Sequence, residues 1–347
     1  MKREPKNPRS WEDTNAHLVK THGGFRNLIK QRIEKLNCDK QDRMRFKALM
    51  GRAPMEGPLR LSDMYANFQF AEFVAGQVRN LRMIGDTLDF YHLTLLADEG
   101  NMSDRAPKFP LRTLTGKADK ALRSAGLDGI FRIEVQALIN WPRKGNGRTL
   151  LGHVHAVVWI KRDAPGNSVA DIREALMPQK PGKVGSWTSE LGANPVVIVP
   201  ITRAMGCPSY WVAYDLKMPH DAKNLFEKKG KPGESGAYNA KFEPTIKGYR
   251  PELAMRLCEL FSQLPLYVTT GGVGAGASFL RRAKSQMALW AKQRQQRWIE
   301  EGKAVVPPFD ERKFWERTHA RRRKEYEPSF IDGPTIQERI ARRISKQ

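Results

Sequence analysis

The sequence predicts an α+β protein whose core is an antiparallel sheet of about five strands with helices on one side. Between residues 85 and 222, β-type runs and helical patterns follow one another in the order β-α-β-β-α-β-α, which is typical of an α+β sandwich. Residues 1–84 and 223–347 instead place apolar side chains at helical spacing. We therefore expect a helical N-terminal segment, a central α+β domain, and a linker followed by a basic helical C-terminal region.

Composition indicates a nucleic-acid partner. The chain has 347 residues and carries 60 Lys and Arg against 37 Asp and Glu, which gives a formal net charge of +23. Such a surface attracts polyanions, because each neutralised phosphate releases condensed counterions. No membrane partner is expected, since the chain has no long apolar run. The three cysteines are scattered and no apolar leader follows Met1, so we expect reduced thiols in a cytoplasmic protein.

The N-terminal segment is expected to hold two helices. The second of them begins at Ser62, a residue type that caps helix N-termini. The apolar residues of the first helix recur at helical spacing: Phe25, Leu28, Ile29, Ile33 and Leu36.

The first half of the central domain contains a strand, a helix and a second strand. Residues 90–96 form a compact β-type run, and residues 111–125 form a helical pattern that ends at Gly126, a residue type that commonly follows a helix C-terminus. Residues 129–137 are the second strand. The turn-rich segment 140–148 then reverses the chain, so this strand should pair antiparallel with the one that follows.

The second half of the central domain begins with the strand 151–160, whose side chains alternate between two faces. A short helix should follow, with Ser168 as its N-cap and Asp171 three residues later, a variant of the capping box. Residues 196–202 form another strand, and Pro200 indicates an edge position.

The strand 151–160 carries the first candidate site. His153 and His155 lie on the same face, because side chains two residues apart in a strand point the same way. Two imidazoles so placed suit two ligands of one metal ion. The alternative is a pair of hydrogen-bonded histidines on a half-buried strand.

A third ligand can come from the preceding strand. Arg132, Glu134 and Gln136 share one of its faces, and Glu134 reaches the same metal if that face coincides with the histidine face. Two imidazoles and a carboxylate, with positions left for water and a phosphate oxygen, suit Mg²⁺ or Mn²⁺. Gln136 is the alternative ligand, and Glu134 is alternatively an exposed strand residue paired with a basic side chain.

The candidate nucleophiles lie on a short helix bracketed by Pro208 and Pro219. Tyr210, Tyr214 and Lys217 fall at i, i+4 and i+7 and so form one stripe along it. A phenol with an ordinary pKa of roughly 10 is a poor nucleophile, and a neighbouring ammonium favours the phenolate. The alternative is that the tyrosine stripe is core packing.

The C-terminal region offers no second catalytic motif. Residues 228–236 are rich in Gly and Lys and predict a linker, and residues 251–264 predict a helix. The glycine-rich run 271–276 lacks the Gly-Lys-Ser/Thr ending of a phosphate-binding loop, so we expect a flexible turn there. The helical tail carries basic residues from Arg281 to the run 321–324. With the overall charge of the chain, this favours a tail that contacts DNA over the alternative of a solvated charged helix.

Taken in order, the strand 90–96, the His-x-His strand and Tyr210-x3-Tyr214-x2-Lys217 resemble the three motifs of HUH endonucleases. These enzymes initiate rolling-circle replication of plasmids and phages, and relaxases and some transposases are related to them. The resemblance covers about residues 85–220. It implies an antiparallel sheet with an HUH/RRM-like nuclease core, and a divalent metal on His153 and His155 with Glu134 as third ligand. It also implies that Tyr214, with Lys217 three residues later, cuts one DNA strand.

Two positions depart from the family pattern. Ala213 stands where two-tyrosine relatives commonly carry a Lys, so a one-tyrosine and a two-tyrosine enzyme, the latter also using Tyr210, both stay open. His92 stands where the family often has a small or β-branched residue, and is either a DNA contact or a core histidine.

The resemblance implies a replication initiator that nicks single-stranded or hairpin origin DNA, leaving a 5′-phosphotyrosine link and a free 3′-OH. No helicase segment is visible, so host helicase and polymerase are the expected partners. Two alternatives stay open: a relaxase or single-strand transposase with the same chemistry, and a basic nucleic-acid-binding protein without catalytic activity.

Overall fold

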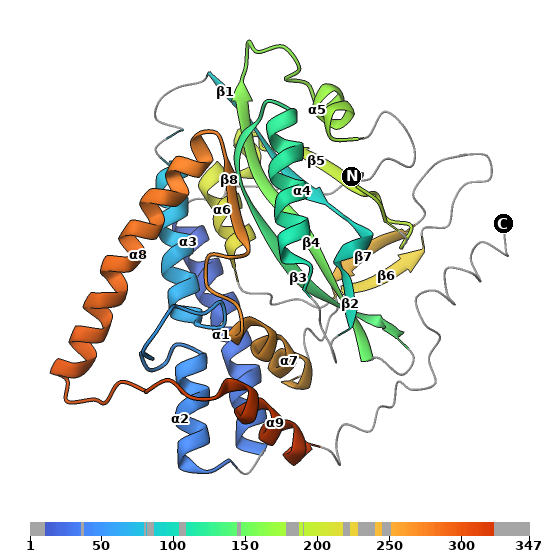
Figure 1. Ribbon diagram of the computed structural model, residues 1–347. Helices are drawn as coiled ribbons and strands as arrows, with labels where there is room; N and C mark the ends of the chain where they lie inside the picture. Colours follow the sequence, from blue (N-terminus) through green and yellow to red (C-terminus); the bar gives the residue numbers. More distant parts are fainter. Residues whose placement is uncertain are drawn as a thin grey trace.

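The histidine strand lies at the centre of a large sheet in a computed structural model of the chain (Figure 1). The structure describes residues 11–35, 38–79, 81, 87–103, 109–143, 147–177, 187–189, 191–217, 223–227, 240–244 and 251–322. Its strands are β1 (Leu88–Leu95), β2 (Asn101–Ser103), β3 (Asp128–Arg143), β4 (Gly147–Lys161), β5 (Val196–Pro200), β6 (Lys223–Glu227), β7 (Ala240–Pro244) and β8 (Thr270–Val273). Its helices are α1 (Trp11–Lys35), α2 (Lys40–Leu49), α3 (Met64–Arg79), α4 (Leu111–Ser124), α5 (Val169–Leu176), α6 (Pro208–Leu216), α7 (Pro251–Ser262), α8 (Ala275–Glu300) and α9 (Glu311–Arg322).

The sheet confirms the predicted α+β class, and the central elements follow the predicted order apart from the short strand β2, which was not predicted. Its strands follow the order β5-β1-β4-β3-β6-β7, with β2 also paired to β4 and β8 also paired to β3. The run β5-β1-β4-β3-β8 is antiparallel throughout and forms the five-stranded core. Strands β6 to β8 come from beyond residue 222, so the sheet extends past the boundary expected for the central domain.

Pairing of β3 with β4 sets the register of the candidate site. The two strands are antiparallel, as predicted from the turn-rich segment between them. Glu134 lies opposite His153 and Arg132 lies opposite His155, so these side chains share one face of the sheet. The predicted coincidence of the glutamate and histidine faces is therefore confirmed.

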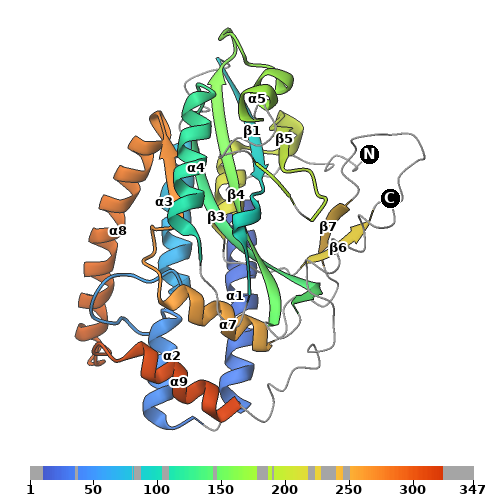
Figure 2. The ribbon, with the colours of Figure 1, turned by 45° about the vertical axis from the view of Figure 1, so that its right-hand side comes forward.

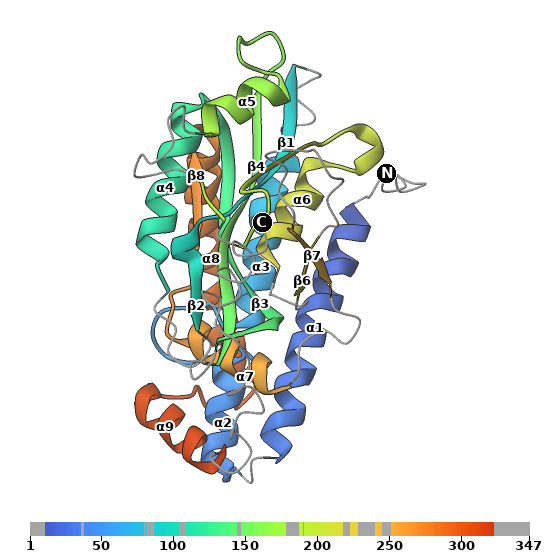
Figure 3. The ribbon, with the colours of Figure 1, turned by 90° about the vertical axis from the view of Figure 1, so that its right-hand side faces the viewer.

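Helices cover both faces of the sheet, which corrects the expectation of helices on one side only (Figures 1 and 3). The face bearing Val154, Ala156 and Val158 packs against α4 and α5. The opposite face packs against α6, α3 and α8, because the histidine face is itself apolar at one end, where Val157 and Trp159 are buried. Burial of apolar area on both faces requires a helical layer on each.

Local sequence signals define the ends of two helices as expected. Gly126 follows the end of α4 with φ 68°, in the left-handed region where a residue without a Cβ is least strained. At the start of α5, the Ser168 hydroxyl accepts from the Asp171 backbone N–H, and the Asp171 carboxylate accepts from the Ser168 N–H. This is the predicted capping box, which satisfies donors that a helix N-terminus leaves unpaired.

The glycine-rich run is not the flexible turn that its composition predicts. Its first half belongs to β8, which pairs with β3, and its last two residues are the start of α8, the helix that follows β8 (Figure 2). A Cβ at Gly276 would overlap the carbonyl oxygen of Gly129 in β3. Glycine is therefore required for close packing of the first turn of α8 on the sheet, and the run has a structural role.

Two further expectations concern segments outside this core. The predicted linker 228–236, and Arg323 and Lys324 of the basic tail, lie outside the described residues.

Among the helices that the structure describes, none combines the length and apolar character needed to cross a bilayer.

Candidate active site

A cavity opens on the histidine face of the sheet, beside the C-terminal end of α6. It has a volume of about 160 Å³. Its lining comes from four strands, from the end of α6, and from the residues that directly follow β1 and α6: Thr94, Leu96, Glu134, Gln136, Leu151, His153, His155, Tyr214, Lys217 and Lys223. Five of the six predicted site residues therefore meet at one place, although they are spread over 84 positions of the sequence from Glu134 to Lys217.

His153, His155 and Glu134 place three ligand atoms close together. The Nε2 atoms of the two histidines are 2.9 Å apart, and Glu134 Oε2 lies 3.0 Å from His155 Nε2 and 3.6 Å from His153 Nε2. Adjacent ligands of an octahedral Mg²⁺ are about 3 Å apart when its bonds are about 2.1 Å. The imidazole planes are inclined at 76°, so their in-plane lone pairs can converge on one point. The residues present therefore fit a divalent metal.

Contacts behind the imidazoles fix which nitrogen faces the cavity. His153 Nδ1 donates to the carbonyl oxygen of Leu151 at 3.2 Å, which leaves its Nε2 as the ligand atom. Thr94 Oγ1 lies 3.1 Å from His155 Nδ1. Burial lowers the pKa of His155 and the nearby His153 adds to this, which outweighs the opposing effect of Glu134. A lowered pKa keeps His155 neutral at pH 7, the form that binds a metal.

The carboxylate of Glu134 is held ionised by its neighbours. Burial raises its pKa, but the charge of Lys217 and the closeness of the His153 and His155 imidazoles outweigh burial and hold the pKa well below its usual range. Lys217 Nζ lies 3.6 Å from Glu134 Oε1, and its side chain is only 3% exposed. An ionised carboxylate is the form required of a ligand, and Lys217 balances its charge in a buried setting.

Lys217 reaches the site from outside the helix. The helix α6 ends at Leu216, and Lys217 has an extended backbone with ψ 158°. Its ammonium donates to the carbonyl oxygen of Tyr214 at 2.9 Å and lies 3.6 Å from the centre of the Tyr214 ring. The prediction that Lys217 continues the helical stripe of Tyr210 and Tyr214 is therefore wrong, because Lys217 lies beyond the end of α6. Its side chain nevertheless lies beside Tyr214.

The two tyrosines differ in their surroundings. Tyr214 is partly exposed and lines the cavity with His153 and His155. Tyr210 is 4% exposed and is not among the lining residues; its ring packs against Trp211 and, at 6.4 Å between centres, against Tyr214. The structure thus brings Tyr214 to the candidate metal ligands and leaves Tyr210 in the packing between α6 and its neighbours.

No family model, curated protein or solved structure matches this chain. The geometry of the cavity is therefore the evidence from which function is argued below.

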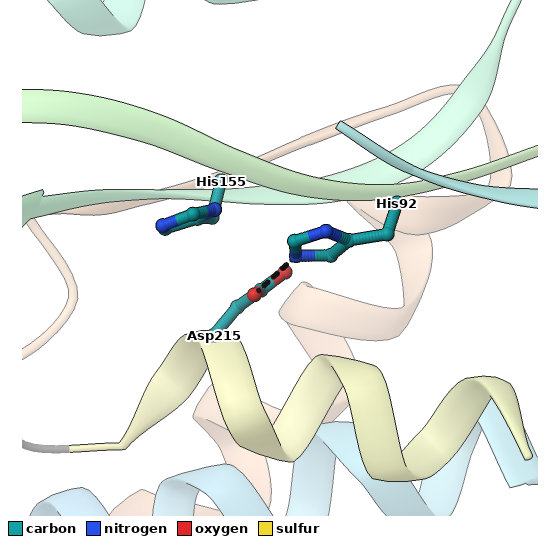
Figure 4. A group of neighbouring side chains, drawn as sticks. All are labelled: His92, His155 and Asp215. Carbon is teal, nitrogen blue, oxygen red and sulfur yellow. Dashed lines mark hydrogen bonds and ion pairs between the residues drawn. The ribbon is translucent and has the colours of Figure 1, made fainter. Parts of the chain in front are cut away.

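A second polar cluster adjoins the first and was not predicted. His92 Nε2 and Asp215 Oδ1 are 2.8 Å apart, and the His92 ring stacks on His155 with 5.3 Å between centres (Figure 4). Both His92 and Asp215 are buried. The alternation of β1 places His92 on the same face as Thr94, but only the pairing of β1 with β4 brings it beside His155, and the sequence alone does not reveal that register.

Glu134 gives a prediction for acid stability of the metal-free protein. Its pKa is lower in the folded protein than in the unfolded chain. As pH falls through the ordinary value of 4.5, the unfolded chain therefore binds more protons than the folded protein, and folding stability is lost. In the Glu134→Gln variant this loss should vanish, and the pH slope of the unfolding free energy should flatten by up to about 1.4 kcal/mol per pH unit. Urea unfolding at about pH 6, 4.5 and 3.5 measures the slope. An identical slope in both proteins would contradict the depressed pKa assigned to Glu134.

Proposed function

We propose that this chain nicks one strand of DNA by transesterification onto Tyr214, and that it acts as a replication initiator. The observation that carries the proposal is that Tyr214 lines the same cavity as His153, His155 and Glu134. A phenol, a ready-made set of metal ligands and a buried ammonium are together the groups that phosphoryl transfer to tyrosine requires. The strongly basic composition supports DNA as the substrate.

The reaction exchanges one phosphodiester for another. The Tyr214 oxygen attacks the scissile phosphorus, the bond from phosphorus to the 3′ oxygen breaks, and the phenolic proton ends on the leaving 3′-OH. The product is a 5′-phosphotyrosine link on the downstream DNA. Because the link conserves the phosphodiester, a 3′-OH can reverse the step and rejoin the strand.

Each residue of the cavity has a part in this scheme. His153, His155 and Glu134 would hold Mg²⁺ or Mn²⁺, and when bound such an ion neutralises charge on the scissile phosphate. Lys217 holds its ammonium against the Tyr214 ring, where its positive charge stabilises negative charge that develops during the reaction. Lys223, which also lines the cavity, offers a further positive charge to the DNA backbone.

Helix α8 offers a basic surface for the DNA outside the cavity. It carries six Lys or Arg residues and one Glu over 26 residues. Arg281, Lys284 and Lys292 on it are exposed. Side chains of this kind bind phosphates without reading sequence, and removal of each phosphate-binding charge reduces the salt dependence of binding.

We expect the triple variant of Arg281, Lys284 and Lys292 to Gln to bind single-stranded DNA more weakly, with the slope of log K against log salt reduced by up to about 2. Fluorescence anisotropy over a salt series measures this slope. The matched control removes the same charge elsewhere, at the exposed Lys303, Arg312 and Lys313. Equal effects in both triple variants would assign the change to overall charge and contradict a role of α8.

End-labelled DNA tests the proposed chemistry. Pools of single-stranded and hairpin oligonucleotides are incubated with the protein and Mn²⁺, then run on a denaturing protein gel. A 3′-end label should migrate with the protein, whereas a 5′-end label should leave on a shortened strand with a free 3′-OH. Transfer of the 5′ label to the protein would overturn the proposal. Cleavage of the DNA in both pools without any covalent adduct would overturn it as well.

A further inference from the structure

His92 connects the candidate metal ligands to the helix that carries Tyr214. It lies in β1 opposite Val157, on the site face of the sheet, and is 7% exposed. Its imidazole contacts three groups: the Asp215 carboxylate at 2.8 Å, the His155 ring at 5.3 Å between centres, and the Trp211 ring at 4.9 Å between centres. It is not among the residues that line the cavity, so it is placed to act through its neighbours.

The partners of His92 on α6 bear directly on the nucleophile. Trp211 and Asp215 are one helical turn apart, and Asp215, the residue next to Tyr214, points toward the sheet (Figure 4). The C-terminal turn of α6 is also held by Arg132 in β3, whose Nη1 donates to the carbonyl oxygen of Leu216 at 2.6 Å. Two strands of the sheet therefore hold the turn on which Tyr214 is carried.

A second metal site is the competing explanation, because His92, His155 and Asp215 also place ligand atoms within 4.8 Å of one another. The ring planes of His92 and His155 are inclined by only 22°. Imidazole lone pairs lie in the ring plane, so two stacked rings direct them side by side rather than toward one ion. The geometry therefore favours a hydrogen bond and a ring stack over coordination.

Stability alone does not explain the pair. Asp215 is 3% exposed, and its Oδ2 has no hydrogen-bond partner among the described residues. A buried carboxylate oxygen without a partner costs stability, and an apolar pair at these positions would avoid that cost. The buried His92–Asp215 pair instead fits a role in orienting the side chains and the helix turn around it.

We propose that His92 is a positioning residue, which fixes the last turn of α6 through Asp215 so that Tyr214 faces the cavity, and supports the His155 ring by stacking. This inference rests on the proposed function for its catalytic consequence. Supporting groups of this kind orient metal ligands and reacting groups, and their removal typically reduces activity by about 10- to 100-fold.

The first test compares two variants at the same position. His92→Ala removes the hydrogen bond and the stack, whereas His92→Gln keeps a donor able to reach Asp215. Single-turnover adduct formation with an end-labelled oligonucleotide should fall about 10- to 100-fold in the Ala variant and recover most of that loss in the Gln variant, with oligonucleotide affinity unchanged in both. An unaltered rate in the Ala variant, or a Gln variant as slow as the Ala variant, would overturn the proposal.

The second test does not depend on nicking. Amide hydrogen exchange of peptides covering α6 should accelerate in the His92→Ala variant and stay at the wild-type rate in Tyr91→Phe. Tyr91 is the neighbour of His92 in β1, but its hydroxyl bonds to Asn167 on the opposite face of the sheet, so it controls for removal of a buried side-chain interaction in the same strand. Exchange in α6 that is unaffected, or accelerated equally by Tyr91→Phe, overturns the positioning role. A wild-type protein that forms no adduct overturns the proposed function alone.

Discussion

The Tyr214→Phe variant should form no covalent adduct with DNA. Phenylalanine lacks the oxygen that attacks phosphorus, so adduct formation should fall by more than about 1,000-fold, which corresponds to more than about 4 kcal/mol of transition-state stabilisation. The ring still packs against Lys217 and Tyr210, so the fold and DNA affinity should be retained. Denaturing gels of end-labelled oligonucleotides measure the adduct, and anisotropy measures binding.

Tyr210→Phe is the matched control for this experiment. It makes the same change one helical turn away, at a buried side chain outside the cavity. We expect its nicking and rejoining rates to match those of the wild type, because of the two tyrosines Tyr214 alone lines the cavity. If Tyr214→Phe retained the adduct and Tyr210→Phe abolished it, the assignment of the nucleophile would be wrong.

The second large effect is expected at the metal ligands. His153→Ala removes one of three converging donor atoms, and we expect Mn²⁺ affinity to fall by more than about 100-fold. Removal of a side chain that only hydrogen-bonds to a ligand already lowers metal affinity by about 10- to 100-fold. Adduct formation at a limiting Mn²⁺ concentration should fall in step with affinity. Isothermal titration calorimetry with Mn²⁺ measures the affinity directly.

Gln136→Ala distinguishes ligands from other groups of the cavity. Gln136 lines the same cavity but lies two residues further along β3, opposite Leu151. Its removal should leave Mn²⁺ affinity unchanged. A large drop in affinity in Gln136→Ala, with Glu134→Gln unaffected, would make Gln136 the third ligand and correct the site.

The α+β class and the convergence of the candidate metal ligands were predictable because they follow from periodicity. Alternation in a strand decides which residues share a face, so the convergence of His153, His155 and Glu134 needed only the antiparallel pairing of two strands joined by a short turn. The helix ends at Ser168 and Gly126 were predictable for a similar reason, since each depends on a local pattern of residues.

Features that depend on packing between distant segments were not predictable. The glycine-rich run is a strand and a helix start because Gly276 packs on Gly129, which local composition does not reveal. Lys217 meets Glu134 through an extended backbone after the end of α6, a position that helical spacing misplaces. The pairing of His92 with Asp215 joins residues 123 positions apart and depends on how α6 packs against the sheet.

Mapping the DNA–protein link by mass spectrometry tests the central claim most directly. The adduct formed with a 3′-labelled oligonucleotide and Mn²⁺ is digested with nuclease and protease, and the peptide carrying the residual nucleotide is sequenced. We predict a phosphodiester on the oxygen of Tyr214, in the peptide that spans α6. A link on any other residue, or no link under conditions in which the DNA is cut, would contradict it.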